Sequence, residues 1–108
     1  MKEVFFIGTS RDNLRKFPKE TRQEAGYQLL RVQYGTVPND WKPMKTIGKN
    51  VKEMRIHVEG EYRIIYVAHF EEAVYVLHAF QKKTQKTLQQ DIELARNRFK
   101  KLRGKNHD

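Results

Sequence analysis

Two arginines and a pair of lysines, Arg55, Arg63, Lys82 and Lys83, are the side chains of this chain best suited to act on a phosphate group. Arginine holds a phosphate through two parallel hydrogen bonds, and lysine acts on it as a point charge. All four residues fall in, or directly after, segments in which apolar residues alternate along the chain. The pattern therefore predicts a cationic surface directed at RNA.

Three segments show the alternation that is typical of β-strands, and they cover residues 51–58, 61–68 and 73–80. Successive side chains of a strand point to opposite faces of a sheet. We therefore expect Met54 and Ile56 to face a core. The side chains in the opposite phase, those of Glu53, Arg55 and His57, are expected to point away from that core.

RNA cleavage without a metal ion makes three demands on side chains. The 2′-hydroxyl must lose its proton, the pentacoordinate phosphate must be stabilised, and the leaving 5′-oxygen must be protonated. Arg55 and Arg63 can meet the second demand, because donors aimed at developing charge lower the barrier. Proton transfer near neutral pH favours His57, His78 or a lysine whose pKa is lowered by neighbouring cations. Phe80, if it shares a face with His78, offers a ring on which a base can stack.

Structural roles compete with each of these assignments. Arg63 can pair across strands with Glu53 or Glu61. His57 can be a solvated strand residue, and His78 can be a hydrogen-bonded histidine within the sheet. Phe80 can belong to the core, and Lys82 and Lys83 can be solvated residues with no part in the chemistry.

The composition is typical of one small globular domain. The chain has 108 residues, of which 38% are hydrophobic and 32% charged, enough for a single modest core. We treat residues 1–108 as one domain and expect residues 103–108 to be a frayed tail. The sequence has no apolar run near the roughly 20 residues that cross a bilayer, and no charged-then-apolar leader. We therefore expect a cytoplasmic protein that does not enter a membrane.

Metal and cofactor chemistry find little support in the sequence. The chain has no cysteine, which excludes a thiolate metal site and a cysteine nucleophile. Its four histidines lack the spacing of a metal site, and no acidic pair suggests two-metal hydrolysis. No glycine-rich phosphate loop is present either. We expect a protein without metal or cofactor.

Positive charge is spread unevenly along the chain. The formal net charge is +9, and the excess is concentrated in residues 41–58 and 81–108, on either side of an acidic stretch at 59–80. Such a field attracts polyanions, and nucleic acid is the commonest of them in the cytosol. An acidic protein partner would be attracted in the same way.

The N-terminal third supplies the first elements that must position these side chains. Residues 2–7 contain a continuous apolar run, which predicts a strand buried on both faces. Ser10 and Asp12 can cap a short helix. Pro18 suits the first turn of a second helix, and Gly35 suits its end. The two helices are expected to form an antiparallel hairpin over a sheet.

Two apolar stripes identify the longer helices. In the second helix, Ala25, Leu29 and Val32 lie on one side. A C-terminal helix is expected to begin at Thr87, which has capping-box spacing to Gln90. Its stripe consists of Leu88, Ile92, Ala95, Phe99 and Leu102.

Between these elements lie a loop and a meander of strands. Residues 36–50 hold Pro38, Pro43, Gly48 and several polar residues and are expected to be a loop, with Trp41 anchoring it against the helical hairpin. Gly60 indicates a short turn between strands. Short turns between neighbouring strands predict an antiparallel meander.

Several short motifs together resemble one protein superfamily. They are Phe17-Pro18, Gln33-Tyr34-Gly35, Trp41-Lys42-Pro43, Glu53-Met54-Arg55, Tyr62-Arg63-Ile64-Ile65-Tyr66 and Leu77-His78-Ala79-Phe80-Gln81-Lys82-Lys83-Thr84. The pattern covers nearly the whole chain and resembles the RelE/ParE toxin superfamily, and within it the HigB-like, phage-related toxins of type II toxin–antitoxin systems. One departure is Leu88, because that branch often has proline there.

The resemblance implies an α+β fold, in which an N-terminal helical hairpin packs on a small antiparallel sheet with a C-terminal helix. It also implies a ribosome-dependent endoribonuclease that cleaves mRNA in the A site and is neutralised by a helix-turn-helix antitoxin. Arg63 matches the strand arginine that such toxins use against the scissile phosphate, and Lys82 or Lys83 falls near a second basic catalytic position. Arg55 and Glu53 lie where other members keep basic residues, so the general base stays unassigned.

The predicted site combines the residues with the resemblance. Its catalytic set is Arg55, Arg63, His78, Lys82 and Lys83, and its RNA-binding set is Lys42, Lys45, Lys49, His57 and Phe80. The three loop lysines of the second set are expected to contact ribosomal RNA phosphates in a salt-sensitive way that does not depend on base sequence.

Two other functions are compatible with the same fold. One is a ParE-like inhibitor of DNA gyrase that acts by binding, since fold does not dictate function. The paired lysines, His78 and a second strand arginine exceed what a binding module needs, which favours the nuclease. The other is an inactive binding protein that only co-represses its operon.

Overall fold

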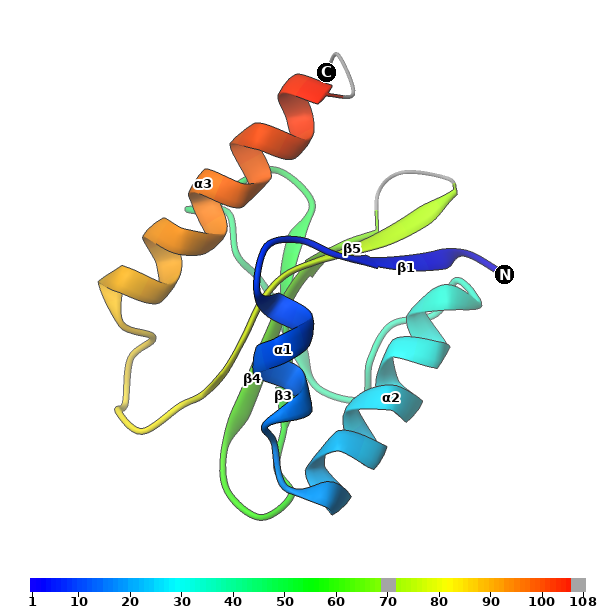
Figure 1. The fold of residues 1–108 in the computed structure, drawn as a ribbon, viewed down its shortest axis with the longest axis vertical. Helices are drawn as coiled ribbons and strands as arrows, with labels where there is room; N and C mark the ends of the chain where they lie inside the picture. The colour runs from blue at the N-terminus through cyan, green and yellow to red at the C-terminus, as the bar shows by residue number, and fades with distance from the viewer. Residues whose placement is uncertain (69–71, 106–108) are drawn as a thin grey trace.

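A five-stranded sheet forms the centre of the protein. The computed structural model describes residues 1–68 and 72–105. The strands are β1 (Glu3–Phe6), β2 (Trp41–Pro43), β3 (Val51–Ile56), β4 (Tyr62–Val67) and β5 (Ala73–Gln81), in the spatial order β1-β5-β4-β3-β2. The meander β3-β4-β5 is antiparallel, as predicted. However, β1 lies alongside β5 and parallel to it (Figure 1), so the sheet is mixed rather than purely antiparallel.

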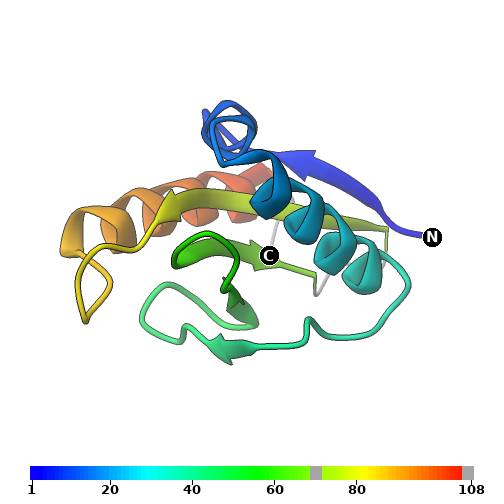
Figure 2. The ribbon, with the colours of Figure 1, turned by 90° about the horizontal axis from the view of Figure 1, so that it is seen from below.

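Helices cover both faces of this sheet. They are α1 (Ser10–Arg15), α2 (Lys19–Gln33) and α3 (Gln89–Lys105). The first two follow one another closely and contribute to the same core, in rough agreement with the predicted hairpin. Figure 2 shows α2 and α3 on opposite sides of the sheet. The predicted α+β architecture is therefore confirmed.

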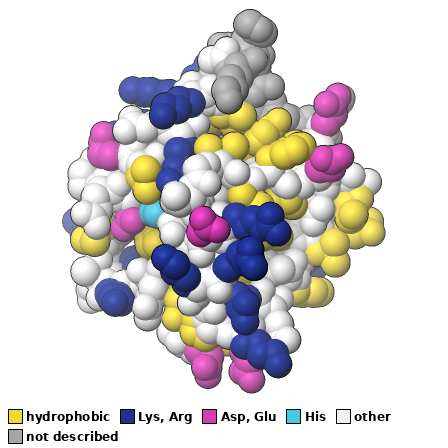
Figure 3. Space-filling view, in the orientation of Figure 1, with side chains coloured by type: hydrophobic (Ala, Val, Ile, Leu, Met, Phe, Trp, Pro, Cys, Tyr) yellow, Lys and Arg dark blue, Asp and Glu magenta, His cyan; other side chains and the backbone are white. Residues whose placement is uncertain are grey.

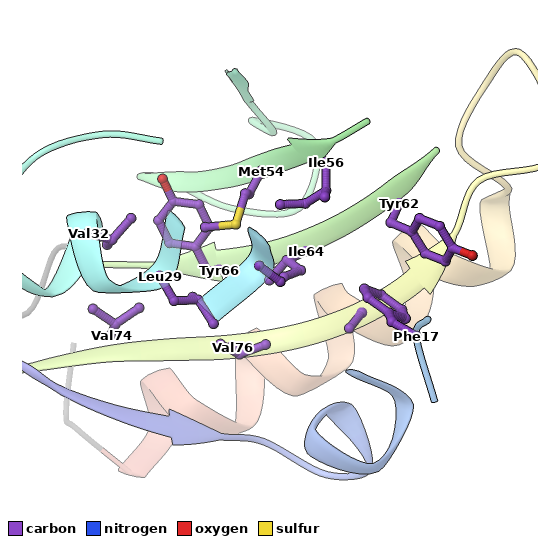
Figure 4. Close-up of a cluster of buried hydrophobic side chains, with 12 residues drawn as sticks. Phe17, Leu29, Val32, Met54, Ile56, Tyr62, Ile64, Tyr66, Val74 and Val76 are labelled. Carbon is purple, nitrogen blue, oxygen red and sulfur yellow. The ribbon is translucent and has the colours of Figure 1, made fainter. Parts of the chain in front are cut away.

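The first core lies between α2 and the sheet (Figure 4). The predicted stripe of Ala25, Leu29 and Val32 is buried against strand residues that include Met54 and Ile64. Full burial of one such aliphatic side chain stabilises a protein by about 1.5–3 kcal/mol. The apolar stripe of α2 and the apolar side chains at every second position of the strands therefore pack in one layer.

The second core lies on the opposite face, under α3. Ala95, Phe99 and Leu102 of α3 pack with Ile65 and other strand residues. The segment that joins β2 to β3 contributes Met44 and Ile47 to the same cluster. Val51, which has the opposite phase to Met54 on β3, packs in this cluster, so α3 covers this face of β3 at Val51.

Several local predictions are wrong. β1 is an edge strand whose residues are exposed or half-buried, because only β5 pairs with it. Ser10 does not cap α1: it is fully buried and donates to the Val76 carbonyl (3.1 Å). The predicted loop at 36–50 contains a strand, β2, because pairing with β3 satisfies its backbone. Trp41 lies in that strand, and Lys52 lies over its ring.

The last helix extends beyond the predicted apolar stripe. α3 continues to Lys105, and the frayed tail at 103–108 stays a prediction. Residues 106–108 lie outside the described residues. Within residues 1–68 and 72–105, none of the helices combines the length and apolarity that crossing a membrane requires.

Candidate functional site

Register brings the strand arginines together on the face that α3 covers. Arg55 of β3 lies directly opposite Arg63 of β4, and Glu53 lies two residues earlier on β3. All three are in the phase of Val51 and Ile65, which pack under α3. The alternation thus correctly separates these residues from Met54.

Glu53 is the centre of this group. Its side chain is 0% exposed, so the expectation that it points away from the core holds only for the first core. Its Oε1 lies 3.4 Å from Arg55 Nε, 3.8 Å from Arg63 Nε and 4.0 Å from Lys42 Nζ. Its Oε2 accepts a hydrogen bond from the Thr87 hydroxyl (3.1 Å). We call these five residues the Glu53 cluster.

Thr87 therefore has a different role from the predicted one. The capping-box spacing placed it at the start of the last helix, but α3 begins at Gln89. The hydroxyl instead reaches back to β3, because a buried carboxylate needs donors for both oxygens. This bond ties the segment before α3 to the cluster.

Arg63 is almost fully buried within the cluster. Its Nη1 donates to Glu61 Oε1 (3.1 Å) and to the Tyr62 carbonyl (2.9 Å). The structural role considered from the sequence, pairing with Glu53 or Glu61, is thus present for both carboxylates. Its Nε is buried and makes no hydrogen bond within the described part of the chain.

Lys82 follows β5 at the edge of the cluster. Its backbone N–H donates to the Glu61 carbonyl (2.7 Å), which fixes its position beside β4. Burial lowers the pKa of its ammonium, and repulsion from Arg63, Lys42 and Arg55 adds to the effect against the attraction of Glu53. Lys83, its neighbour, is exposed.

A groove of about 770 Å³ leads to the cluster. One wall comes from residues 42–46, and the other comes from residues 82–92. Three residues connect the groove with the cluster. Lys42 and Thr87 belong to both, and Lys82 lines the groove at the edge of the cluster. The remaining lining residues are Pro43, Met44, Lys45, Thr46, Gln85, Lys86, Gln89 and Ile92. We call this the basic groove, because its lining includes four lysines and, within residues 1–68 and 72–105, no acidic residue.

His78 and Phe80 lie deeper and outside the basic groove. The rings stack with centroids 4.9 Å apart, so the predicted shared face is observed. His78 is buried, and its Nε2 is 2.7 Å from Asp91 Oδ1 at the start of α3. Burial lowers the pKa of His78, although Asp91 opposes the change. Phe80 is half-buried beside the second core and opposite Arg63.

His57 is held between two carboxylates. Its Nε2 is 2.6 Å from Asp40 Oδ2, and its Nδ1 is 2.8 Å from Glu61 Oε1. The hydrogen bond to Asp40 is the main cause that raises the pKa of His57, and the hydrogen bond to Glu61 adds to it. Both ring nitrogens are therefore engaged within the protein.

The loop lysines divide between two sides of β2. Lys42 belongs to the Glu53 cluster, and Lys45 lines the basic groove. Lys49 instead lines a second hollow, of about 440 Å³, which also includes Trp41 and Lys45. Positive charge extends further: Figure 3 shows Lys and Arg side chains gathered down the middle of the face on which α1 and α2 lie.

Several groove residues escaped the sequence analysis. Lys86 and Gln85 carry no motif, and only the approach of residues 42–46 makes them part of a groove. One feature of the sequence pointed to Glu53: it lies two residues before Arg55, so both side chains are on the same face of the strand. In residues 1–68 and 72–105, histidine and acidic side chains form no group of three that could hold a metal ion.

Comparison with known proteins supports the fold and the family. Residues 12–100 match the family described as Phage derived protein Gp49-like (DUF891). Among curated proteins, no sequence matches. The fold is similar to that of the E. coli toxin RelE, in a mutant with two arginines replaced by alanine in the free state, with a TM-score of 0.65 at 15% identity. The similarity covers 94% of this chain and 97% of that chain.

These matches confirm the predicted RelE-like fold, whereas the HigB-like branch stays a prediction. The family match covers most of the sequence and includes every residue of the Glu53 cluster and of the basic groove. The chain belongs to the phage-derived Gp49-like family.

Proposed function

We propose that this protein is a toxin of the RelE type that cleaves mRNA in the ribosomal A site. The observation that carries the proposal is the convergence of Lys42, Arg55 and Arg63 around one buried carboxylate, beside a groove that Lys42 and Lys82 line and in which none of the described lining residues is acidic. Membership of the Gp49-like family and the RelE-like fold support the same assignment.

The chemistry is a metal-free transesterification. The 2′-oxygen forms a bond to the adjacent phosphorus while the bond from phosphorus to the 5′-oxygen breaks, which leaves a 2′,3′-cyclic phosphate and a 5′-hydroxyl. The proton of the 2′-hydroxyl passes to a general base, and the leaving 5′-oxygen receives a proton from a general acid. The cations stabilise the negative charge that develops on the phosphate.

The geometry supports distinct roles for these cations. Arg55, whose side chain is 30% exposed, is placed to contact the phosphate. Arg63 is nearly buried and adds its positive charge behind Arg55. Lys82 is the candidate general base, because its lowered pKa raises the fraction of neutral amine. Lys42, on the opposite flank of β3 and β4, is the candidate general acid. Glu53 is a positioning residue, since it is inaccessible but contacts the cations.

The same family supports a protein partner. A toxin of this kind is held inactive by a cognate antitoxin, for which a helix-turn-helix protein is our proposal. A net charge of +9 suits a partner that is acidic or amphipathic.

Cleavage of an mRNA on purified, programmed ribosomes tests the function. We expect Arg55→Ala to lower the single-turnover cleavage rate by about 100-fold, as for removal of one donor to a developing charge. We expect Lys82→Ala to lower it by at least about 100-fold, as for loss of a general base. Lys100→Ala removes an exposed lysine of α3 outside the basic groove and is expected to leave the rate unchanged.

Three results would contradict the proposal. The first is full activity of both variants. The second is cleavage of naked RNA as fast as cleavage of translating mRNA, which would remove the ribosome from the mechanism. The third is the appearance of trapped DNA breaks with intact mRNA after the protein is induced in cells, which would indicate a gyrase inhibitor.

A further inference from the structure

The second hollow lies around Trp41 at the outer edge of the sheet. β2 is the last strand of the sheet, so this edge is not covered by another strand in the described structure. The hollow has a volume of about 440 Å³. Its lining residues are Trp41, Pro43, Lys45, Lys49, Asn50, Val51 and Lys52, and we call it the Trp41 pocket.

The lining combines an aromatic ring with cations. Trp41 is half-buried, and the Lys52 ammonium lies 5.2 Å from the centroid of its ring. Lys45 and Lys49 are exposed at the same pocket, and none of the described residues that line it is acidic. An aromatic face stacks with any nucleobase, and lysines beside it can contact the attached phosphates.

The Trp41 pocket adjoins the basic groove, since Pro43 and Lys45 line both. Along β2, Lys42 points to Glu53, while Trp41 has the opposite phase and lines the pocket. A strand of RNA that leaves the groove across β2 therefore meets Lys45 first and the indole next.

We propose that the Trp41 pocket binds an unstacked nucleotide of the substrate RNA, next to the nucleotides held at the Glu53 cluster. The base stacks on the indole in place of the Lys52 ammonium, and Lys45 and Lys49 contact the flanking phosphates. This inference rests on the proposed function and adds a substrate subsite to it. The indole favours an RNA strand over an acidic peptide, because nucleobases stack on an aromatic face whereas acidic side chains would use the lysines alone.

Fluorescence gives a direct test, because Trp41 is the only tryptophan of the chain. The probe is a 2′-O-methyl oligoribonucleotide, which cannot undergo 2′-oxygen attack. We expect it to quench the emission, since stacking brings the base onto the fluorophore. We also expect Trp41→Leu to weaken its binding roughly 5–150-fold, the range for loss of one base–aromatic stack. Trp41→Phe, which keeps a ring, is expected to bind nearly as well.

A cleavage assay identifies which RNA supplies the base. With programmed ribosomes, Trp41→Leu is expected to raise the concentration of toxin needed for half-maximal cleavage and to leave the saturating rate nearly unchanged. An mRNA with an abasic site at one position beside the cut should abolish this difference between wild type and Trp41→Leu. A penalty that persists for abasic sites at every flanking position would assign the pocket to ribosomal RNA and overturn the proposal.

The remaining outcomes separate this inference from the proposed function. Unchanged emission together with ribosome-dependent cleavage by wild type would overturn the subsite alone. Quenching by an acidic peptide but not by RNA would also overturn it, in favour of a protein partner. Loss of cleavage in Lys100→Ala to the same extent as in Lys49→Ala would show that the pocket lysines act only through net charge. Absence of cleavage by the wild-type protein on ribosomes would overturn both the proposed function and the nucleotide subsite.

Discussion

At the scale of single residues, Glu53 decides how the cations are held. Arg55, Arg63 and Lys42 repel one another, and a cluster of like charges is stable only with a compensating group. A carboxylate with 0% exposure supplies that charge, and contacts to Arg55 and Thr87 involve both of its oxygens. The arginines are thereby positioned before any substrate arrives, which removes an ordering cost from binding.

Replacement of Glu53 should therefore affect stability as well as activity. We expect Glu53→Ala to lower the free energy of unfolding by about 3–5 kcal/mol, because it leaves the buried Arg63 without a partner for its Nε side. The measurement is urea denaturation. Glu93→Ala is the matched control, since its ion pair with Arg96 is exposed and should contribute less than about 1 kcal/mol. Equal losses in the two variants would refute the role of Glu53.

At the scale of elements, the segment between β2 and β3 is fixed by its contact with α3. Met44 and Ile47 are buried in the second core, and Gly48 approaches Phe99 closely. A Cβ on Gly48 would lie 2.2 Å from Phe99 Cε2. This segment lines both the basic groove and the Trp41 pocket, so its packing against α3 sets the shape of both.

Two glycine-to-alanine variants test this packing. Gly48→Ala is expected to destabilise the protein by about 1–3 kcal/mol, because Phe99 must move in a filled core. Gly26→Ala is the control: it lies inside α2 with no atom within 4 Å of the added Cβ. It should instead stabilise the protein by about 0.5–1 kcal/mol through helix propensity. Thermal unfolding of both variants measures the difference, and a neutral Gly48→Ala would show that α3 does not hold this segment.

At the scale of the whole molecule, two histidines shape the dependence of stability on pH in opposite ways. The bonds of His57 to Asp40 and Glu61 raise its pKa above the ordinary 6.5. Its stabilising effect is therefore complete below pH 6.5 and is lost as pH rises through the raised value. Burial lowers the pKa of His78 below 6.5. Its effect is complete above pH 6.5 and is lost as pH falls, because the unfolded chain then binds a proton more readily.

The unfolding free energy is therefore expected to decline on both sides of about pH 6.5. His57→Gln should flatten the decline on the alkaline side and leave the acid side in place. His78→Gln should flatten the part of the acid side just below pH 6.5, where the carboxylates have not yet protonated. Urea denaturation between pH 5 and pH 9 measures the profile. An alkaline limb that survives His57→Gln would mean that another group controls it.

Periodicity explains why much of the fold was predictable. The stripe of Ala25, Leu29 and Val32 and the alternation around Met54 depend only on local geometry, and both are confirmed by burial. The parallel pairing of β1 with β5 was missed, because no local pattern connects residues 3–6 to residues 73–76. The strand β2 was missed because it has three residues and is defined by its partner.

The amino-acid sequence by itself determined which residues share a face: Arg55 with Glu53 on β3, and His78 with Phe80 on β5. It could do so because the directions of side chains along a strand depend on the backbone alone. Only the tertiary structure decided that α3 and the segment before it pack on this face and that Glu53 is buried and Arg63 nearly so. Burial and the approach of residues 42–46 to 82–92 depend on contacts between distant segments, and these contacts turn a cationic strand face into a groove.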